Sequence, residues 1–150
     1  MQKLQFYQVD AFTDRLFSGN PAGVCIPDTW LSDEMMQSVA KENNLAETAF
    51  VVPSGKDYMI RWFTPSVEVD LCGHATLASA FVLFNLYHYP ESIISFHSRK
   101  SGLLQVSRKE ELLILDFPAD RLELCGREMI HAAEEAIGVT PVEMYRGKSD

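Results

Sequence analysis

The chain has little basic charge and no long hydrophobic run. Of its 150 residues, 13 are Lys or Arg and 21 are Asp or Glu, so the formal net charge is −8. A surface this acidic repels phosphate groups, so we expect neither nucleic acid nor an anionic membrane as a partner. The N-terminus lacks the continuous apolar segment of a signal peptide. The longest apolar stretch, residues 75–87, is too short to span a bilayer.

Cysteine is also scarce. Cys25, Cys72 and Cys125 are odd in number and far apart in the chain. This argues against a disulfide framework and for a reducing compartment, so we expect the protein to be cytoplasmic.

Apolar residues make up 47 % of the chain, enough for a real core. Short β-branched and aromatic runs predict about seven strands, and helices are predicted near 32–44, 74–87 and 127–137. These elements predict an α+β fold in which a curved, mixed, mostly antiparallel and barrel-like sheet wraps around a central buried helix. We expect residues 1–150 to form a single N-terminal lobe, with 142–150 as the start of a missing second lobe.

Residues 10–23 are rich in turn formers and are predicted to be a loop centred on Gly19-Asn20-Pro21. The segment Gly19–Gly23 has neither the length nor the Lys-Ser/Thr end of a phosphate-binding loop. It is either a simple tight turn or a ligand-binding segment in which Pro21 fixes the Asn20 side chain to hydrogen-bond a ligand.

The segment from Glu68 to Thr76 runs from a polar strand end through Gly73 and His74 into a helix that is apolar on nearly every side. Such a helix must be buried, yet its first turn presents unpaired N–H groups and the positive end of the helix dipole. We therefore expect this corner to bind a small anion such as a substrate carboxylate. The dipole disfavours an imidazolium, so His74 is either a neutral donor or proton relay, or simply a helix cap.

Glu47 is a lone carboxylate between a helix end and an apolar strand. Apolar surroundings raise the pKa of a carboxyl group, which suits general acid/base chemistry near neutral pH. The alternative is a solvated residue at a strand edge.

Glu68, Asp70, Cys72 and His74 alternate along the chain and would share one face of a regular strand. No second His or Cys stands nearby at zinc-like spacing, so we expect no metal and no cofactor. Cys72 could act as a thiolate base at the helix N-terminus, although an inert buried cysteine is the more frequent case.

Five segments in order resemble the N-terminal half of the PhzF-like isomerases, phenazine-biosynthesis proteins related to diaminopimelate epimerase. The segments are Gln8–Phe12, Gly19–Val24, Asn44–Phe50, Arg61–Pro65 and Glu68–Thr76. The resemblance implies a two-lobed fold with the active site in the cleft between lobes, each lobe being a barrel-like sheet around a helix.

The resemblance also implies proton transfer without a cofactor. Glu47 stands at the position of the family's catalytic glutamate and His74 at that of the neighbouring histidine, while the Gly73-His74 turn would present N–H groups to the substrate carboxylate. We expect Asn20, Asp70, Gly73 and Thr76 to contact the substrate. The family also uses an acidic residue from its second lobe.

Two features depart from phenazine-pathway members. Asp70 stands where these often have proline, and Leu71-Cys72 where they often have Phe-Ala. The sequence Asp70-Leu71-Cys72 resembles that of the broad branch of this family that includes eukaryotic relatives. We expect an isomerase or epimerase of a small carboxylate-bearing substrate, with little turnover from this lobe alone. The alternatives are a non-catalytic interaction module and a thiol-based racemase; a homodimer through the exposed lobe face is also expected.

Overall fold

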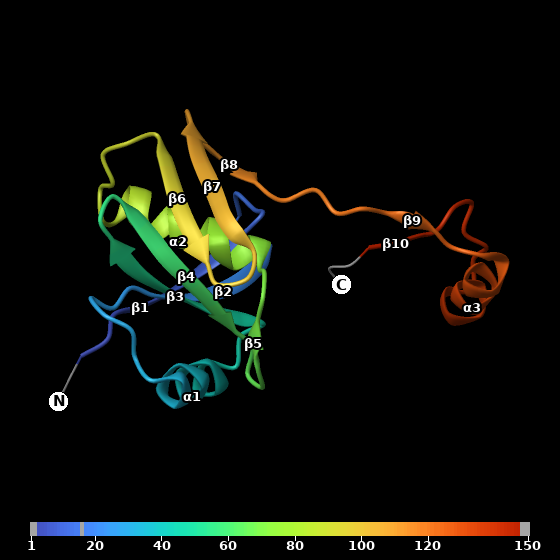
Figure 1. Ribbon diagram of the computed structural model, residues 1–150, viewed down its shortest axis with the longest axis horizontal. Helices are drawn as coiled ribbons and strands as arrows, with labels where there is room; N and C mark the ends of the chain where they lie inside the picture. The colour runs from blue at the N-terminus through green and yellow to red at the C-terminus, as the bar shows by residue number, and fades with distance from the viewer. Residues whose placement is uncertain (1–2, 16, 148–150) are drawn as a thin grey trace. The chain divides into compact units, whose positions relative to one another are not determined.

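The computed structural model describes residues 3–15 and 17–147 (Figure 1). The chain divides into two compact units, Met1–Phe117 and Pro118–Asp150, and each is described by itself. The first unit holds the large sheet and the first two helices. Its elements are β1 (Phe6–Ala11), β2 (Asn20–Cys25), α1 (Asp33–Asn43), β3 (Glu47–Ser54), β4 (Asp57–Phe63), β5 (Glu68–Val69), α2 (Gly73–Asn85), β6 (Ile93–Ser98), β7 (Gly102–Lys109) and β8 (Leu112–Asp116).

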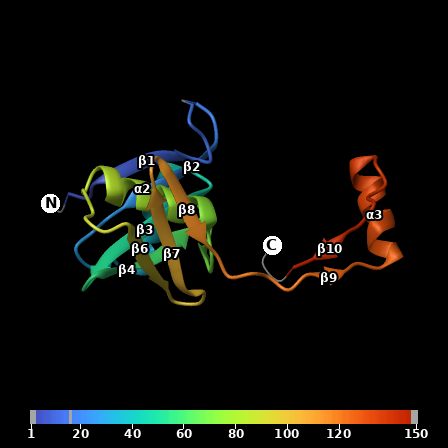
Figure 2. The same cartoon turned by 90° about the horizontal axis from the view of Figure 1, so that it is seen from above.

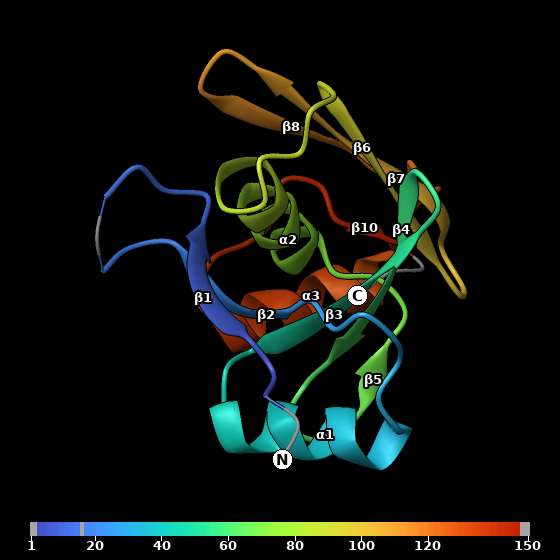
Figure 3. The ribbon, with the colours of Figure 1, turned by 90° about the vertical axis from the view of Figure 1, so that its left-hand side faces the viewer.

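The sheet is mixed and mostly antiparallel. Its strand order is β1-β2-β3-β4-β6-β7-β8, and β5 pairs with β4 beside this path. The β2–β3 and β4–β6 pairs are parallel, and the other pairs are antiparallel. The sheet curves around α2, with β1 and β8 at its two ends, while α1 lies on the outer face (Figures 2 and 3). The predicted α+β fold, a curved sheet around a buried helix, is confirmed.

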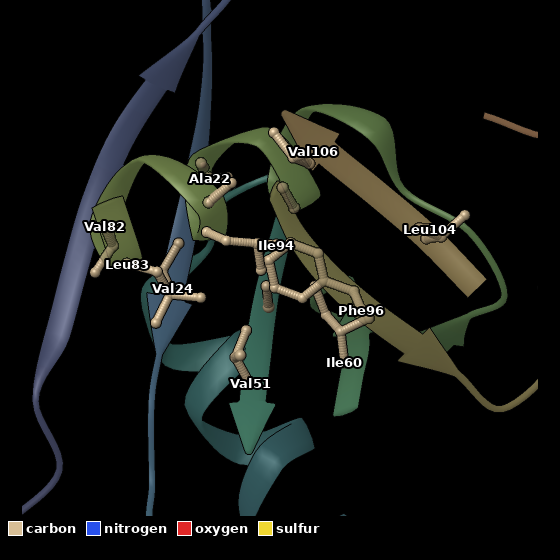
Figure 4. Packing of buried hydrophobic residues seen from close by; sticks show 14 of the residues in the cluster. Ala22, Val24, Val51, Ile60, Val82, Leu83, Ile94, Phe96, Leu104 and Val106 are labelled. Atoms are coloured by element: carbon tan, nitrogen blue, oxygen red, sulfur yellow. The ribbon is translucent and has the colours of Figure 1, made fainter. Parts of the chain in front are cut away.

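The central helix α2 is buried because it is apolar on every side. Its side chains pack with those of five strands in one continuous core (Figure 4). Full burial of each large apolar side chain contributes about 1.5–3 kcal/mol, so this core outweighs any single polar contact. The two buried hydroxyls of α2 bond within the helix: Thr76 donates to the Cys72 carbonyl and Ser79 to the Ala75 carbonyl.

Helix α1 covers the opposite face of the sheet through a smaller core that includes Met36, Phe50 and Phe63. Ser32 caps the start of this helix, since its hydroxyl accepts a hydrogen bond from the Met35 N–H. Asn44 ends the helix in the left-handed conformation, at φ 51°. The chain then enters β3 only three residues later, and this short connection fixes where Glu47 begins the strand.

The loop predicted for residues 10–23 is wrong at both ends, because β1 continues to Ala11 and β2 begins at Asn20. The pairing of β2 with β3 starts at Ala22, so Pro21, which has no N–H to donate, precedes that ladder. The glycines of this segment have another cause than a loop. Gly19 has φ +81°, a conformation that side chains rarely adopt, and Gly23 lets β2 approach the Thr48 side chain closely.

The second unit contains β9 (Glu123–Leu124), α3 (Arg127–Ile137) and β10 (Tyr145–Arg146). The predicted helix is confirmed, and Gly138 ends it with φ 73°. Within the segment 142–150, expected to begin a second lobe, the two residues of β10 form a strand, and residues 148–150 lie outside the described residues. No residue of α3 is buried. Among the described residues, no helix is long and apolar enough to cross a bilayer.

Candidate active site

The first residue of β3 carries the candidate acid/base group. Glu47 aligns with Ala22 across the parallel β2–β3 pair. Ala22, Ala49 and Val51 all belong to the core around α2, and alternate residues of a strand share a face. Glu47 therefore projects from the same face as these residues, toward the central helix and at the end of the sheet where β3 begins.

The N-terminus of α2 forms the other side of the site. Cys72 is the N-cap residue in extended conformation (φ −149°, ψ 113°), and Gly73 is the first helical residue. The Cys72 side chain makes no capping hydrogen bond, and the first turn of α2 carries no acidic residue. The positive end of the helix dipole is therefore not neutralised by an acidic side chain of its own first turn.

Glu47 and His74 meet between these two elements. Oε2 of Glu47 lies 3.2 Å from Nε2 of His74. The Glu47 side chain is 22 % exposed and that of His74 is 10 % exposed. Their separation is within hydrogen-bonding range, but the angles are unfavourable, and Nε2 makes no hydrogen bond within the described residues. A ligand that bonds to Nε2 would therefore not have to break a hydrogen bond of this atom within the described residues.

His74 favours the neutral state. Desolvation by burial lowers its pKa, and this effect outweighs the opposing influences of the Glu47 carboxylate and the Pro21 carbonyl. This direction disfavours a charged imidazolium in the contact with Glu47. The neutral histidine expected from the sequence is consistent with this shift.

Cys72 lies against the same imidazole. Its Sγ is 3.4 Å from Nδ1 of His74. Burial raises the pKa of the Cys72 thiol to about 12, and the nearby Glu47 carboxylate acts in the same direction. A neutral thiol that donates to Nδ1 would leave the ring proton on Nε2, on the side of Glu47. A resting thiolate at Cys72 is therefore unfavourable near neutral pH, despite its position at a helix N-terminus.

Asn20 and Gly73 lie close to this arrangement in the fold. Asn20 is the first residue of β2, is half-buried and shares its face with Ala22; its side chain makes no hydrogen bond within the described residues. At Gly73, an added Cβ would lie 3.5 Å from the Phe117 ring, which is ordinary contact. Neither packing nor a left-handed φ requires glycine at 73, so close approach of a ligand to the backbone remains the prediction for this position.

The structure places Thr76 and Asp70 differently. Thr76 is fully buried, and its hydroxyl donates to the Cys72 carbonyl at 2.6 Å, so it closes the first turn of α2. Asp70 is exposed, and its carboxylate pairs with Lys100 at 2.7 Å. The alternating residues of 68–74 do not share one strand face, as a regular strand would require, because β5 ends at Val69 and the helix starts at Gly73.

Sequence reasoning missed the polar cluster that anchors the segment leading into this corner. Arg61 is almost fully buried; it donates twice to Glu68, at 2.6 Å each, and once to Asp33 at 2.7 Å. The guanidinium also lies over the rings of Trp30 and Phe63. An arginine inside the apolar strand Asp57–Phe63 was the available signal, because a buried guanidinium requires carboxylate partners.

Taken together, the described residues place a carboxylate, a neutral imidazole and an uncapped helix N-terminus around one point. A carboxylate ligand bound at the N-terminus of α2 would lie beside a group able to accept and return a proton. The chemistry that fits is proton transfer on a carbon close to a carboxylate.

Comparisons with known proteins bear on the family and the fold of the chain. The family model described as "Phenazine biosynthesis-like protein" matches residues 9–147. An uncharacterized isomerase of Pseudomonas aeruginosa is 55 % identical over 148 residues, covering 99 % of this chain and 55 % of the relative. A human phenazine biosynthesis-like domain-containing protein is 44 % identical over 124 residues, covering 77 % of this chain and 43 % of the relative.

Solved structures give the same result. A crystal structure of a PhzF-family phenazine biosynthesis protein from Enterococcus faecalis superposes with a TM-score of 0.88 at 49 % identity, covering 96 % of this chain and 54 % of that one. The structure of a predicted epimerase from Pseudomonas aeruginosa has a TM-score of 0.73 at 22 % identity, a likeness of fold alone. The chain thus spans about half the length of the relatives it matches.

Proposed function

Because this chain belongs to the phenazine biosynthesis-like (PhzC-PhzF) family, we propose that it supplies half of the active site of an isomerase or epimerase that moves a proton on a small carboxylate-bearing substrate. The observation that carries the proposal is the 3.2 Å approach of the Glu47 carboxylate to Nε2 of His74 at the uncapped end of α2. Glu47 is the general acid/base that removes a proton from one carbon and returns it to the substrate. No metal or organic cofactor takes part in this step.

The substrate carboxylate docks at the N-terminus of α2. The N–H groups of Gly73 and His74 lie in the first helical turn, whose amides have no partner within the helix. The helix dipole adds an attraction of about 0.3–1 kcal/mol for an anion at an exposed end, and more where the end is partly buried. Neutral His74 orients the reacting part of the substrate by donating a hydrogen bond, and Asn20, at the start of β2, contributes a further one.

The second unit is the beginning of the second lobe. Its helix α3 buries no residue, and its apolar side chains, among them Leu122, Leu124, Ile137 and Val142, are exposed. Such a unit is too small to enclose a core of its own and requires further chain to cover it. Turnover by residues 1–150 alone is therefore expected to be low, because the second wall of the cleft and its acidic residue come from elsewhere.

A thiol-based reaction through Cys72 is the weaker mechanism. Burial holds the pKa of this thiol at about 12, so the thiolate is scarce near neutral pH. A non-catalytic interaction module is the other candidate, since the exposed apolar residues of the second unit could drive association.

Incubation in heavy water with a panel of small amino and hydroxy acids tests the proposed function. The chain is assayed alone and mixed with the separately produced C-terminal half of the Enterococcus faecalis relative. Deuterium uptake into a carboxylic acid of the panel supports an isomerase. Absence of uptake under both conditions, together with self-association of the chain, favours the interaction module.

A further inference from the structure

Three side chains with different metal-ligating atoms converge at the candidate site. Glu47, Cys72 and His74 each offer one ligand atom, and these atoms all lie within 4.8 Å of one another. The ligand atoms of a tetrahedral zinc site stand about 3.3–3.8 Å apart, given zinc–ligand bonds of about 2.0–2.3 Å. The separation between Glu47 Oε2 and His74 Nε2, 3.2 Å, is already close to this range. The 3.4 Å contact of Cys72 Sγ is with Nδ1, the other ring nitrogen, so an ion bound through Nε2 requires the Cys72 side chain to turn toward it.

A second observation points to a ligand at the same place. His74 is nine-tenths buried, and its Nε2 has no hydrogen-bond partner within the described residues. Buried polar atoms are rarely left unsatisfied, because the desolvation of such an atom costs about 1–3 kcal/mol. An occupant that bonds to the imidazole at this position would offset that cost.

We propose that Glu47, Cys72 and His74 form a site for a thiophilic divalent ion, Zn²⁺, which binds in competition with the substrate. Carboxylate, thiolate and imidazole are all ligands that Zn²⁺ accepts, and three protein ligands leave a fourth position open. The ion binds Cys72 as the thiolate, so the proton of the thiol is released to solvent on binding. Sequence spacing could not indicate this site, because Glu47 comes from a different element than Cys72 and His74.

The consequence for activity is inhibition, and this part rests on the proposed function. A bound ion would occupy the carboxylate that accepts the substrate proton and the imidazole beside it. Cysteine at position 72 would thereby make the site sensitive to zinc, since the soft thiolate ligand favours this ion over hard cations such as Mg²⁺.

Titration of the substrate-free chain with Co²⁺, a spectroscopic substitute for Zn²⁺, tests the metal site without any assay of activity. The expected result is one bound ion that gives a thiolate-to-cobalt charge-transfer band in the near ultraviolet, and displacement of this band by Zn²⁺. The control is the double variant Cys25→Ala/Cys125→Ala, in which Cys72 is the single remaining thiol. We expect this variant to retain the band, and Cys72→Ala to lose it with a drop in Zn²⁺ affinity of about tenfold or more.

The outcomes are distinct. Absence of the band in the wild-type chain, or its loss in the variant that keeps only Cys72, would overturn the proposal without depending on the folding of Cys72→Ala. Binding without a thiolate band would place the ion elsewhere, for example at the exposed pair of His131 and Glu135, and would equally overturn the proposal. The proposed isomerase function survives either result, because it requires no metal.

Discussion

The Glu47 carboxylate lies 3.2 Å from Nε2 of His74, although one residue starts a sheet strand and the other belongs to the first turn of the central helix. Backbone pairing of β2 with β3 sets the position of Glu47, and burial of α2 in the core sets that of His74. The proposed acid/base group and the helix end proposed to bind the substrate carboxylate are thus held by the same packed core. Rigid placement of this kind is what proton transfer requires of its participants.

The proposed carboxylate dock can be tested with a matched pair of substitutions at Gly73. Gly73→Pro removes the N–H, yet proline is well tolerated at the first position of a helix, and the preceding Cys72 is already extended as proline requires. Gly73→Ala keeps the N–H and adds a Cβ in ordinary contact with Phe117. We expect Gly73→Pro to weaken binding of a small carboxylic acid ten- to a hundredfold, the equivalent of one hydrogen bond to a charged group.

Isothermal titration and the amide NMR shifts of residues 74 and 75 provide the measurement. Both variants should unfold within about 1 kcal/mol of the wild type, because neither disturbs the core. Equal ligand affinity for Gly73→Pro and the wild type would show that the Gly73 N–H does not hold the carboxylate.

The Arg61 cluster should be the most sensitive polar feature of the first unit. Glu68→Gln leaves the buried guanidinium without its bidentate partner, and we expect a loss of about 2 kcal/mol in the free energy of unfolding. Asp33→Asn should cost clearly less, since the Asp33 side chain is 65 % exposed and its ion pair is screened by solvent. Urea denaturation of the two variants gives the comparison, and an equal loss in both would contradict this ranking.

Acidification should weaken the same cluster in a defined direction. The hydrogen bond and charge of Arg61 hold the pKa of Asp33 below its ordinary value of 3.8. A carboxyl group whose pKa is lower in the folded state stabilises the fold above its unfolded pKa, and this contribution disappears as the pH falls through the folded pKa. The difference in urea midpoint between the wild type and Asp33→Asn should therefore be constant near neutral pH and shrink below about pH 4. A difference that grows on acidification would refute the assignment.

The second unit should be dispensable for the stability of the first. The two core clusters contain no residue beyond Leu115 among those the structure describes. A chain ending at Phe117 should therefore unfold cooperatively, with a free energy within about 1 kcal/mol of that of residues 1–150. It should also associate less, because it lacks the exposed apolar residues of α3 and its flanking strands. Sedimentation velocity and urea denaturation test both parts, and loss of cooperative unfolding would mean that residues 118–150 complete the core.

Sequence patterns predicted the elements whose signals are local. The helices predicted near 32–44, 74–87 and 127–137 reflect burial or hydrogen bonding within a short segment, as in the apolar residues of α2 and the Ser32 cap of α1. The start of β2 was missed, because Gly19-Asn20-Pro21 carries turn formers for another reason: Gly19 requires a positive φ, and Pro21 lies before the parallel ladder.

The site was predictable only in part for the same physical reason. Glu47 and His74 were identified by resemblance and by their positions at element ends, but no local pattern fixes the distance between them. Cys72 joins them because the chain turns at Val69 and begins a helix at Gly73, so the alternation of residues 68–74 breaks before it can form a shared face. Asp70 lies in the segment between β5 and α2, and its carboxylate forms an ion pair with Lys100.

Deuterium uptake from heavy water by the Glu47→Gln variant, measured with the complementary half present, tests the central claim most directly. Two controls accompany it: Glu42→Gln, which removes an exposed carboxylate of α1, and Cys72→Ala, which removes the thiol. A general acid/base at position 47 predicts that uptake falls by about 10²–10⁴-fold in Glu47→Gln and persists in both controls. Uptake that survives in Glu47→Gln, or that disappears only in Cys72→Ala, would contradict proton transfer by Glu47.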